Sequence, residues 1–429
     1  MGNEKLIVAC VQQRLRLPQS LEDYTDDARR FLRIAESKHA RLVVFPELAG
    51  MSLTLPLLAG LRATLFKRID AGRRRSASLS DRIAGALAER MTTWLKADLR
   101  SSLKGLLDVE GERVWRTYSE IFGKLAKEFR VTLVAPSAYM PDPRDGVIRN
   151  IAGVFGPNGE LNGHQAKVMK QADDADIAKP GSHWDVIATE VGLLGVILGN
   201  DVLYPEVGRV LAYQGAEMLI AQAACQHPAM YNKLRSGILA RMQDNQLFCV
   251  ASFAIGGHEF NRQNAEPYLG KSAILAPQEL TPRYNGVLVE MGNQRSEGVV
   301  TAEWDFEALK ELWEVTNMQL HLPMSGPQMT QMLASLYMQL QSQPELPLLE
   351  VAEEIPEAEP VVEEEIPMPE QILTLADLPV MASITSPWPL PEATPSAYQF
   401  NTATPPPNYP RGSDTTRRSD DETDEMDAV

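Results

Sequence analysis

The stretch from Gly195 to Arg209 constrains the fold most, because three local signals follow one another within it. An apolar run ends at Leu198, the polar residues Gly199-Asn200-Asp201 form a tight turn, and Pro205 opens a helical pattern. Proline suits the first turn of a helix, where its missing N–H would have no partner anyway. A buried strand that turns sharply into a helix is typical of α/β proteins.

The rest of the chain repeats this alternation of strands and helices. Residues 5–12 alternate as a strand, and residues 23–38 have helical spacing. The all-apolar run 42–45 is typical of a strand that is covered on both faces. Further strands are predicted at 131–135, 148–155, 184–189, 193–198, 218–221, 247–253, 273–276 and 299–303, with helices at 114–129, 205–213, 231–245 and 305–313. Two sheets with helices on their outer faces accommodate this order.

One interval, about 51–111, interrupts the alternation and is predicted to be a helical insertion. Its second half has an apolar stripe at helical spacing, formed by Ile83, Leu87, Met91, Trp94, Leu95, Leu99, Leu103 and Leu106. A basic cluster at 67–75 precedes this stripe. One interpretation is a helical segment packed on its own domain. The other is a basic amphipathic hairpin that contacts a partner or a membrane surface.

The chain changes character after residue 320. Residues 321–340 are expected to contain one amphipathic helix, and 341–429 are rich in proline and acidic residues and are expected to be disordered. Of the 57 acidic and 41 basic side chains, 19 and 3 lie after residue 340, which leaves 38 of each before it. The net charge of −16 therefore belongs to the tail, which we expect to contact a protein partner. Residues 371–378 could form a short helix there on binding.

Composition excludes several classes of protein. The near-neutral charge of residues 1–340 argues against nucleic-acid binding, which needs a basic face. Three cysteines form no disulfide framework and favour a reducing, cytoplasmic compartment. No window has the roughly 18 apolar residues of a membrane-spanning helix. Neither histidines at metal-ligand spacing nor glycine-rich phosphate loops occur, so we expect no metal and no cofactor.

Two blocks, Leu42 to Leu48 and Gly195 to Arg209, resemble the nitrilase (carbon–nitrogen hydrolase) superfamily, with supporting blocks at 150–160, 241–248 and 270–274. The resemblance covers about residues 5–314. It implies a carbon–nitrogen hydrolase-like domain at 1–320 with a four-layer α-β-β-α sandwich fold, interrupted by the insertion. It also implies a homodimer or larger homo-oligomer that assembles through one layer of helices, and a small amide or carboxylate as ligand.

The resemblance also implies roles for particular residues. In the family a cysteine attacks the substrate carbon, a glutamate is the general base, and a lysine stabilises the oxyanion. Glu47 fits the base and Lys167 the lysine, with Lys170 as a competing candidate. Gly199 stands where the cysteine is expected, although the neighbouring Asp201 and the residues Pro205, Glu206 and Arg209 agree with the family pattern.

Two of the family's polar groups are therefore missing from the sequence. The second glutamate found in many members has no match, because no acid follows the strand at 131–135 before Asp142. For the nucleophile, Cys225 is the alternative, with His227 as a nearby base. A buried, inert thiol is the competing interpretation. Cys10 and Cys249 fall within predicted strands and are expected in the core.

Three functions remain open. The first is a catalytically silent or impaired amidase-like protein that serves in small-molecule binding, scaffolding or regulation. The second is an active amide or nitrile hydrolase that uses an unrecognised nucleophile, or water activated by Glu47. The third is a peripheral membrane or assembly protein that acts through the insertion and the tail.

Overall fold

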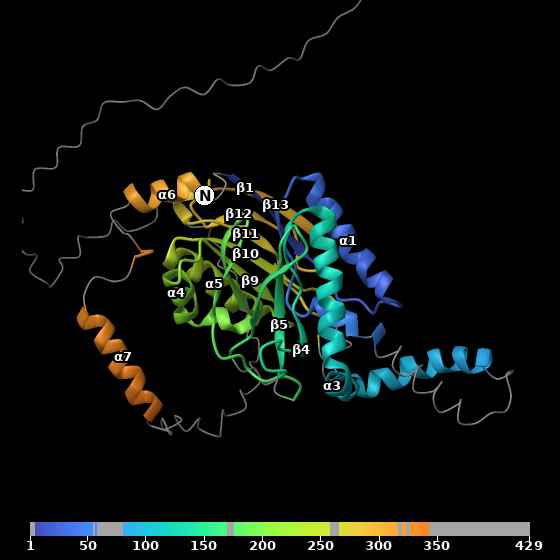
Figure 1. Cartoon of the computed structure of the whole chain (residues 1–429). Coiled ribbons are helices and arrows are strands. Elements are labelled where there is room, and N and C mark those ends of the chain that lie inside the picture. The colour runs from blue at the N-terminus through green and yellow to red at the C-terminus, as the bar shows by residue number, and fades with distance from the viewer. Residues whose placement is uncertain are drawn as a thin grey trace, which may run out of the picture. The chain divides into compact units, whose positions relative to one another are not determined.

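Short apolar runs alternating with amphipathic helices form two stacked β-sheets, each covered on its outer face by helices (Figure 1). The computed structural model describes residues 5–54, 56–57, 80–169, 176–257, 266–315, 320–322 and 327–342. All of them belong to the first of two compact units, Met1–Pro344 and Glu345–Val429. The predicted four-layer α-β-β-α sandwich is confirmed.

The first sheet has seven strands in the order β13-β1-β2-β3-β5-β4, with β6 also paired to β5. The strands β1, β2 and β3 are parallel, and every other pairing in this sheet is antiparallel. The strands are β1 (Lys5–Gln12), β2 (Leu42–Val44), β3 (Thr132–Val134), β4 (Ala138–Pro141), β5 (Ile148–Phe155), β6 (Leu161–Ala166) and β13 (Gly298–Asp305).

The second sheet has six strands in the order β12-β11-β10-β9-β8-β7, again with three parallel strands, β8, β9 and β10, at its centre. Its strands are β7 (Val186–Thr189), β8 (Gly192–Leu198), β9 (Met218–Ala223), β10 (Phe248–Phe253), β11 (Ala273–Leu275) and β12 (Val287–Glu290). Parallel strands bring their carboxyl ends to one edge of a sheet, which is where open α/β sheets place their ligands.

Alternating residues of the two sheets fill the core between them, with Val8, Val44, Val196 and Ile220 as examples. The opposite faces pack on helices. α1 (Leu21–Ser37) and α3 (Ser80–Phe129) cover the first sheet, whereas α4 (Pro205–Tyr213) and α5 (Pro228–Asn245) cover the second. The described residues also form η1 (Ala49–Leu53), η2 (Gly199–Leu203), η3 (Gln278–Leu280), α6 (Phe306–Val315) and α7 (Pro327–Ser342).

Some predicted boundaries were wrong. The helix predicted at 114–129 is only the end of α3, which begins at Ser80 and runs through the predicted end of the insertion. The short strands β4, β6 and β12 were not predicted. Residues 55 and 58–79 of the insertion and residues 343–429 of the tail lie outside the described residues. Residues 341–342, assigned to the tail, end α7 instead.

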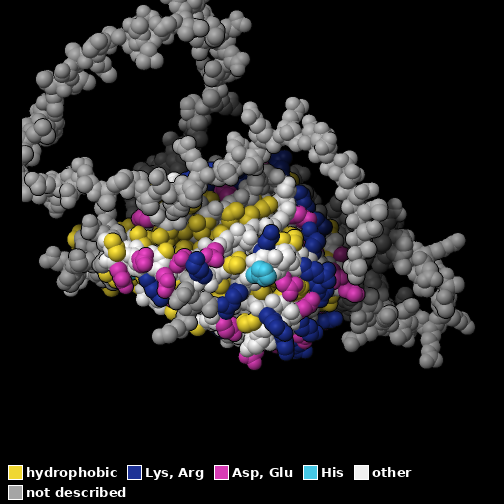
Figure 2. Space-filling view, turned by 90° about the horizontal axis from the view of Figure 1, so that it is seen from above, with side chains coloured by type: hydrophobic (Ala, Val, Ile, Leu, Met, Phe, Trp, Pro, Cys, Tyr) yellow, Lys and Arg dark blue, Asp and Glu magenta, His cyan; other side chains and the backbone are white. Residues whose placement is uncertain are grey.

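The face in Figure 2 shows Lys and Arg side chains next to Asp and Glu side chains. Around α1 such charges form ion pairs, Arg29 with Glu128 and Arg30 with both Asp27 and Glu297. Charges of both signs therefore lie side by side on this face. Within the described ranges, no helix is both long and apolar enough to cross a bilayer.

Candidate functional site

The candidate site lies where the carboxyl ends of strands from both sheets meet. Glu47 follows β2 of the first sheet, while Gly199 follows β8 and Ala224 follows β9 of the second. Gly199 begins η2 directly after the buried run of β8 and has a φ of +54°. This left-handed conformation favours glycine, because a side chain there would crowd the following carbonyl oxygen.

Glu47 is almost completely buried, with 1% of its surface exposed, and it accepts several hydrogen bonds. Asn150 Nδ2 donates to Oε1 at 3.0 Å, and Lys167 Nζ donates to the same oxygen at 3.1 Å. The backbone N–H of Ala224 donates to Oε2 at 2.9 Å. A buried carboxylate needs such donors, since burial of an unpaired charge is very unfavourable. The site therefore ties both sheets to one carboxyl group.

Lys167 is the buried cation of the site, with 5% of its surface exposed. It directly follows β6, and its backbone N–H donates to the Asn150 carbonyl at 2.9 Å. This bond continues the pairing of β5 with β6 and directs the lysine to the carboxylate of Glu47, with which it forms an ion pair. The competing candidate, Lys170, lies outside the described residues.

Gly199 faces this ion pair directly. A Cβ atom placed on Gly199 would lie 2.8 and 2.9 Å from the two carboxylate oxygens of Glu47 and 2.9 Å from Lys167 Nζ. These separations are shorter than van der Waals contact, so any side chain at 199 would push the two charged groups aside. The structure thus brings three of the predicted site residues, Glu47, Lys167 and Gly199, into direct contact.

Asp201 fixes the turn after Gly199 to the segment that carries Lys167. Its buried carboxylate accepts hydrogen bonds from the backbone N–H groups of Val168 at 2.9 Å and Met169 at 2.8 Å, and from the Trp184 indole at 3.1 Å. Burial raises the pKa of Asp201 above its ordinary value, and these donors oppose the rise. The backbone on either side of the Glu47–Lys167 pair is therefore held in place.

Cys225 follows Ala224, whose N–H binds Glu47, but Cys225 is not arranged as a nucleophile. Its thiol is buried and donates to the Leu269 carbonyl at 3.2 Å. Burial, with a further contribution from the Glu47 charge, raises the pKa of the thiol to about 12. A cysteine with such a pKa is almost entirely protonated at neutral pH, and the thiolate is the reactive form. His227 is exposed at the start of α5.

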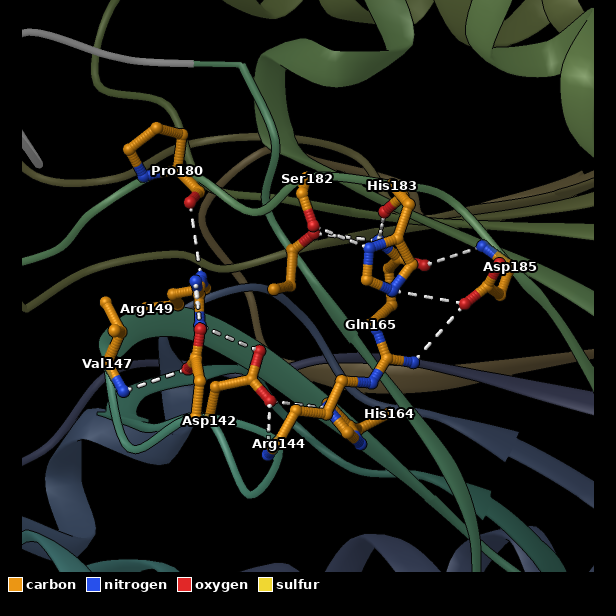
Figure 3. A network of polar contacts seen from close by, with 12 residues as sticks. Asp142, Arg144, Val147, Arg149, His164, Gln165, Pro180, Ser182, His183 and Asp185 are labelled. Carbon is orange, nitrogen blue, oxygen red and sulfur yellow. Dashed lines mark hydrogen bonds and ion pairs between the residues drawn. The ribbon is translucent and has the colours of Figure 1, made fainter.

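The remaining predicted residues lie in other contacts. Asp142, the first acid after β3, follows β4 and is bound by Arg149 at 3.1 Å and by His164 at 3.1 Å (Figure 3). On α4, Arg209 donates to the Leu320 carbonyl at 2.7 Å, and Glu206 accepts a hydrogen bond from Tyr337 of α7. Cys10 and Cys249 are buried in strands, as predicted.

Sequence reasoning missed Asn150 and the Ala224 N–H as partners of Glu47. Asn150 stands in one of the blocks that carry the family resemblance, and an asparagine inside an apolar strand is itself a signal of a buried polar contact. A backbone N–H leaves no signal in the sequence. Among the described residues, no three His, Cys, Asp or Glu side chains gather into a group that could hold a metal ion.

Chemically, the site combines a buried carboxylate that can accept a proton with an ammonium group that can stabilise an oxyanion. Position 199 contributes only backbone. Two buried acceptor oxygens in the same region, Asn150 Oδ1 and Asn200 Oδ1, have no hydrogen-bond partner among the described residues. These atoms can accept N–H groups from a ligand.

Comparison with known proteins places this geometry in context. A sequence model of the family described as carbon–nitrogen hydrolase matches residues 7–313. The chain is 22% identical over 305 residues to the probable hydrolase YhcX of Bacillus subtilis, a match that covers 71% of the chain and 50% of that protein. It is 24% identical over 217 residues to the omega-amidase NIT2-A of Xenopus laevis, covering 47% of the chain and 72% of that enzyme.

Solved structures agree in fold. The carbon–nitrogen hydrolase of Helicobacter pylori superposes with a TM-score of 0.53 at 20% identity, covering 72% of the chain and 92% of that structure. Nit3 of Saccharomyces cerevisiae, a nitrilase-superfamily member, gives a TM-score of 0.51 at 19% identity, and the match covers 76% of the chain and 97% of that structure. At these identities the likeness concerns the fold alone. The match to YhcX spans only about half of that relative's length.

Proposed function

The chain belongs to the carbon–nitrogen hydrolase family, and from that premise we propose that it is a catalytically silent, amidase-like member that binds a small molecule instead of cleaving it. One observation carries the proposal. Gly199, at the turn where the family resemblance implies a cysteine, faces Glu47 and Lys167 with no side chain of its own. Without a nucleophile, the covalent intermediate of amide hydrolysis cannot form.

The state of the other groups supports the same proposal. Cys225 is the cysteine nearest the site in sequence, and its hydrogen-bonded thiol has a pKa raised to about 12. Glu47 and Lys167 contact each other at 3.1 Å, an arrangement in which each charge neutralises the other. The pair is then a buried polar group that can contact a ligand, and the described cysteines leave Glu47 no thiol at position 199 to deprotonate.

The proposed ligand is a small amide or carboxylate. Lys167 Nζ provides a donor for its oxygen, and the unpartnered oxygens of Asn150 and Asn200 provide acceptors for amide N–H groups. Recognition of a primary amide needs both kinds of group close together. The omega-amidase of Xenopus laevis acts on amides according to its name, and for this chain we propose amide binding only.

A second candidate function is hydrolysis by water that Glu47 activates. The observation in its favour is that the carboxylate and the ammonium group are both present and in contact, as a general base and an oxyanion-stabilising group would need to be. This function requires no side chain at 199. It differs from the first in predicting release of ammonia from small amides.

The test measures ammonia release from a panel of small amides together with calorimetric binding of the same amides. We expect no release by the native protein or by Cys225→Ala, and binding that is lost in Glu47→Gln and Lys167→Met. Cys225→Ala is the matched control, because Cys225 lies next to Ala224 of the site while its thiol donates to the Leu269 carbonyl. Its binding should be unchanged.

The variant Gly199→Cys tests the vacant position itself. The added side chain must displace the Glu47 carboxylate and Lys167 Nζ, so its thiol would be placed against both groups. We expect acylation of this thiol by reactive amides, detectable by mass spectrometry and absent in the native protein. Native ammonia release that is abolished by Glu47→Gln but survives in Cys225→Ala would overturn the silent function in favour of activated water.

A further inference from the structure

A cavity of about 620 Å³ lies on the outer side of the first sheet, between α3 and the turn that joins β4 to β5. The α3 wall contributes Trp115, Glu112, Arg116 and Glu120, and the turn contributes Pro141 and Pro143. Ligand pockets in proteins commonly have volumes of about 300–1,000 Å³ and combine apolar walls with a few polar groups. This cavity shares no lining residue with the Glu47–Lys167 site.

The turn that forms one wall is braced by Asp142. The Asp142 N–H donates to the Val147 carbonyl at 2.9 Å, and the Gly146 N–H donates to the Asp142 carbonyl at 2.7 Å. The Asp142 carboxylate is bound by Arg149 and His164, as Figure 3 shows. Arg149 also pairs with Asp145 of the same turn, so these contacts fix the shape of the proline-containing wall.

The α3 wall is equally well fixed. Tyr118 and Phe122 on the same helix are completely buried in the core. Trp115 stacks on Tyr118 with ring centroids 5.9 Å apart and meets His164 edge-on at 5.9 Å. Both walls are therefore formed before a ligand arrives, which reduces the entropy lost on binding.

The charges around Trp115 indicate the class of ligand. Glu112, Arg116 and Glu120 follow one another at a spacing of four residues on the exposed face of α3, so one guanidinium stands between two carboxylates. These three side chains together carry one net negative charge beside an indole ring, the aromatic ring that attracts cations most strongly. The proline rings add apolar surface opposite.

We propose that this cavity is a binding site for an organic cation, an ammonium or guanidinium group carried on a small apolar body. The cationic group contacts Trp115 and the carboxylate of Glu112 or of Glu120, while the second carboxylate adds to the negative charge of the cavity. The apolar body packs against Pro141 and Pro143. Such a cation can be a free amine or the arginine or lysine side chain of a polypeptide, and both present the same chemistry to the cavity.

The test is calorimetric titration of the full chain with phenethylamine and phenethylguanidine, with 2-phenylethanol and phenylacetate as neutral and anionic counterparts. We expect the two cations to bind and their counterparts to bind at least about tenfold more weakly. A short capped peptide with a single arginine distinguishes the sources. Tighter binding of the peptide than of the free cations assigns the site to a polypeptide, and the reverse assigns it to a free amine.

Variants of α3 locate the binding. The double variant Glu112→Gln/Glu120→Gln should weaken both cations by about three- to tenfold, as expected for losing partly exposed charges. The matched control is Asp108→Asn, one turn before Glu112 on the same helix and outside the cavity lining. Equal binding of phenylacetate, or cation binding that is unchanged in the double variant, would overturn the proposal. Trp115→Leu, checked for folding by circular dichroism, should weaken binding further.

Discussion

At position 199 the backbone conformation and the surrounding charged groups both favour glycine. A φ of +54° is strained for a residue with a side chain, by about 1–2 kcal/mol. A Cβ there would also meet both oxygens of Glu47 and the ammonium of Lys167. Glycine relieves both problems, and it lets the carboxylate and the ammonium approach to 3.1 Å. The ion pair thus occupies space that a side chain would otherwise take.

A double-mutant cycle measures this contact. We expect Glu47→Gln and Lys167→Met each to lower the free energy of unfolding, because each leaves a buried charge without its main opposite charge. The double variant should be less destabilised than the sum of the two, with a coupling free energy of about 1–3 kcal/mol. Urea-induced unfolding, followed by circular dichroism, measures the change in the free energy of unfolding for each single variant and for the double variant.

The comparison pair is Arg235 with Glu290, which are in contact at 2.9 Å but more exposed to solvent. Exposed ion pairs contribute little, because water screens them. A Glu47–Lys167 coupling no larger than that of this surface pair would mean that the two groups do not act together. The site would then need a different electrostatic explanation.

The sequence allowed some of these residues to be predicted and not others. Glu47 and Gly199 were predictable because each lies at the end of an apolar run, in a block that resembles the nitrilase superfamily. The donors Asn150 and Ala224 were not, because they lie more than 100 residues from Glu47 in sequence. Strand pairing within the first sheet brings Asn150 of β5 to Glu47, and the stacking of the second sheet on the first brings Ala224. The ion pair itself is a tertiary contact with no local pattern.

At the scale of elements, prediction succeeded where the apolar pattern was continuous. The strands β1 and β5 and the helix α4 have the predicted bounds. The strand β6 was missed because its sequence, Leu161 to Ala166, is mostly polar and half-buried. The helix α3 was predicted in two parts, one inside the insertion that ends at about residue 111 and one at 114–129. In the structure Gly111 packs against the Pro141 ring, so the glycine serves a close approach within a continuous helix.

Two other glycines of α3 predict opposite effects of the same substitution. A Cβ on Gly123 would lie 2.6 Å from the Gly159 carbonyl oxygen, whereas a Cβ on Gly105 would have nothing within 4 Å. We expect Gly123→Ala to destabilise the protein by about 1–3 kcal/mol, the usual range for overpacking. Gly105→Ala should stabilise it by up to about 1 kcal/mol, because alanine favours helices more than glycine does.

Thermal unfolding of the two variants beside the native protein checks this pair. Because both changes add one methyl group to the same helix, helix propensity cancels in the comparison. A stabilising Gly123→Ala would show that α3 and the Gly156–Glu160 turn are further apart than their backbone contact indicates. A destabilising Gly105→Ala would place an unrecognised contact on the exposed side of α3.

At the scale of the whole molecule, buried acidic protons are spread over both sheets and their helices. Burial raises the pKa of Cys10 in β1 and of Cys225 after β9 to about 12. It also raises the pKa of Cys249 in β10. Tyr118 of α3 and Tyr24 of α1 shift upward for the same reason. In the remaining layer, burial raises the pKa of Tyr231 of α5 to about 12, so each of the four layers holds a group that stays protonated in the folded state.

This distribution predicts that alkaline conditions unfold the molecule as one unit. Above a pH of about 9, the ordinary thiol value, unfolded cysteines lose protons that Cys10, Cys225 and Cys249 keep when folded. The folded state then binds more protons, so stability falls as pH rises, by about 1.4 kcal/mol per pH unit for each thiol until its folded pKa is reached. Urea unfolding across this range measures how steeply stability falls with pH. The variant Cys249→Ala should reduce this slope by about 1.4 kcal/mol per pH unit, the contribution of one thiol. An unchanged slope in that variant would mean that the thiol of Cys249 is ionised in the folded protein, which its complete enclosure between apolar strands argues against.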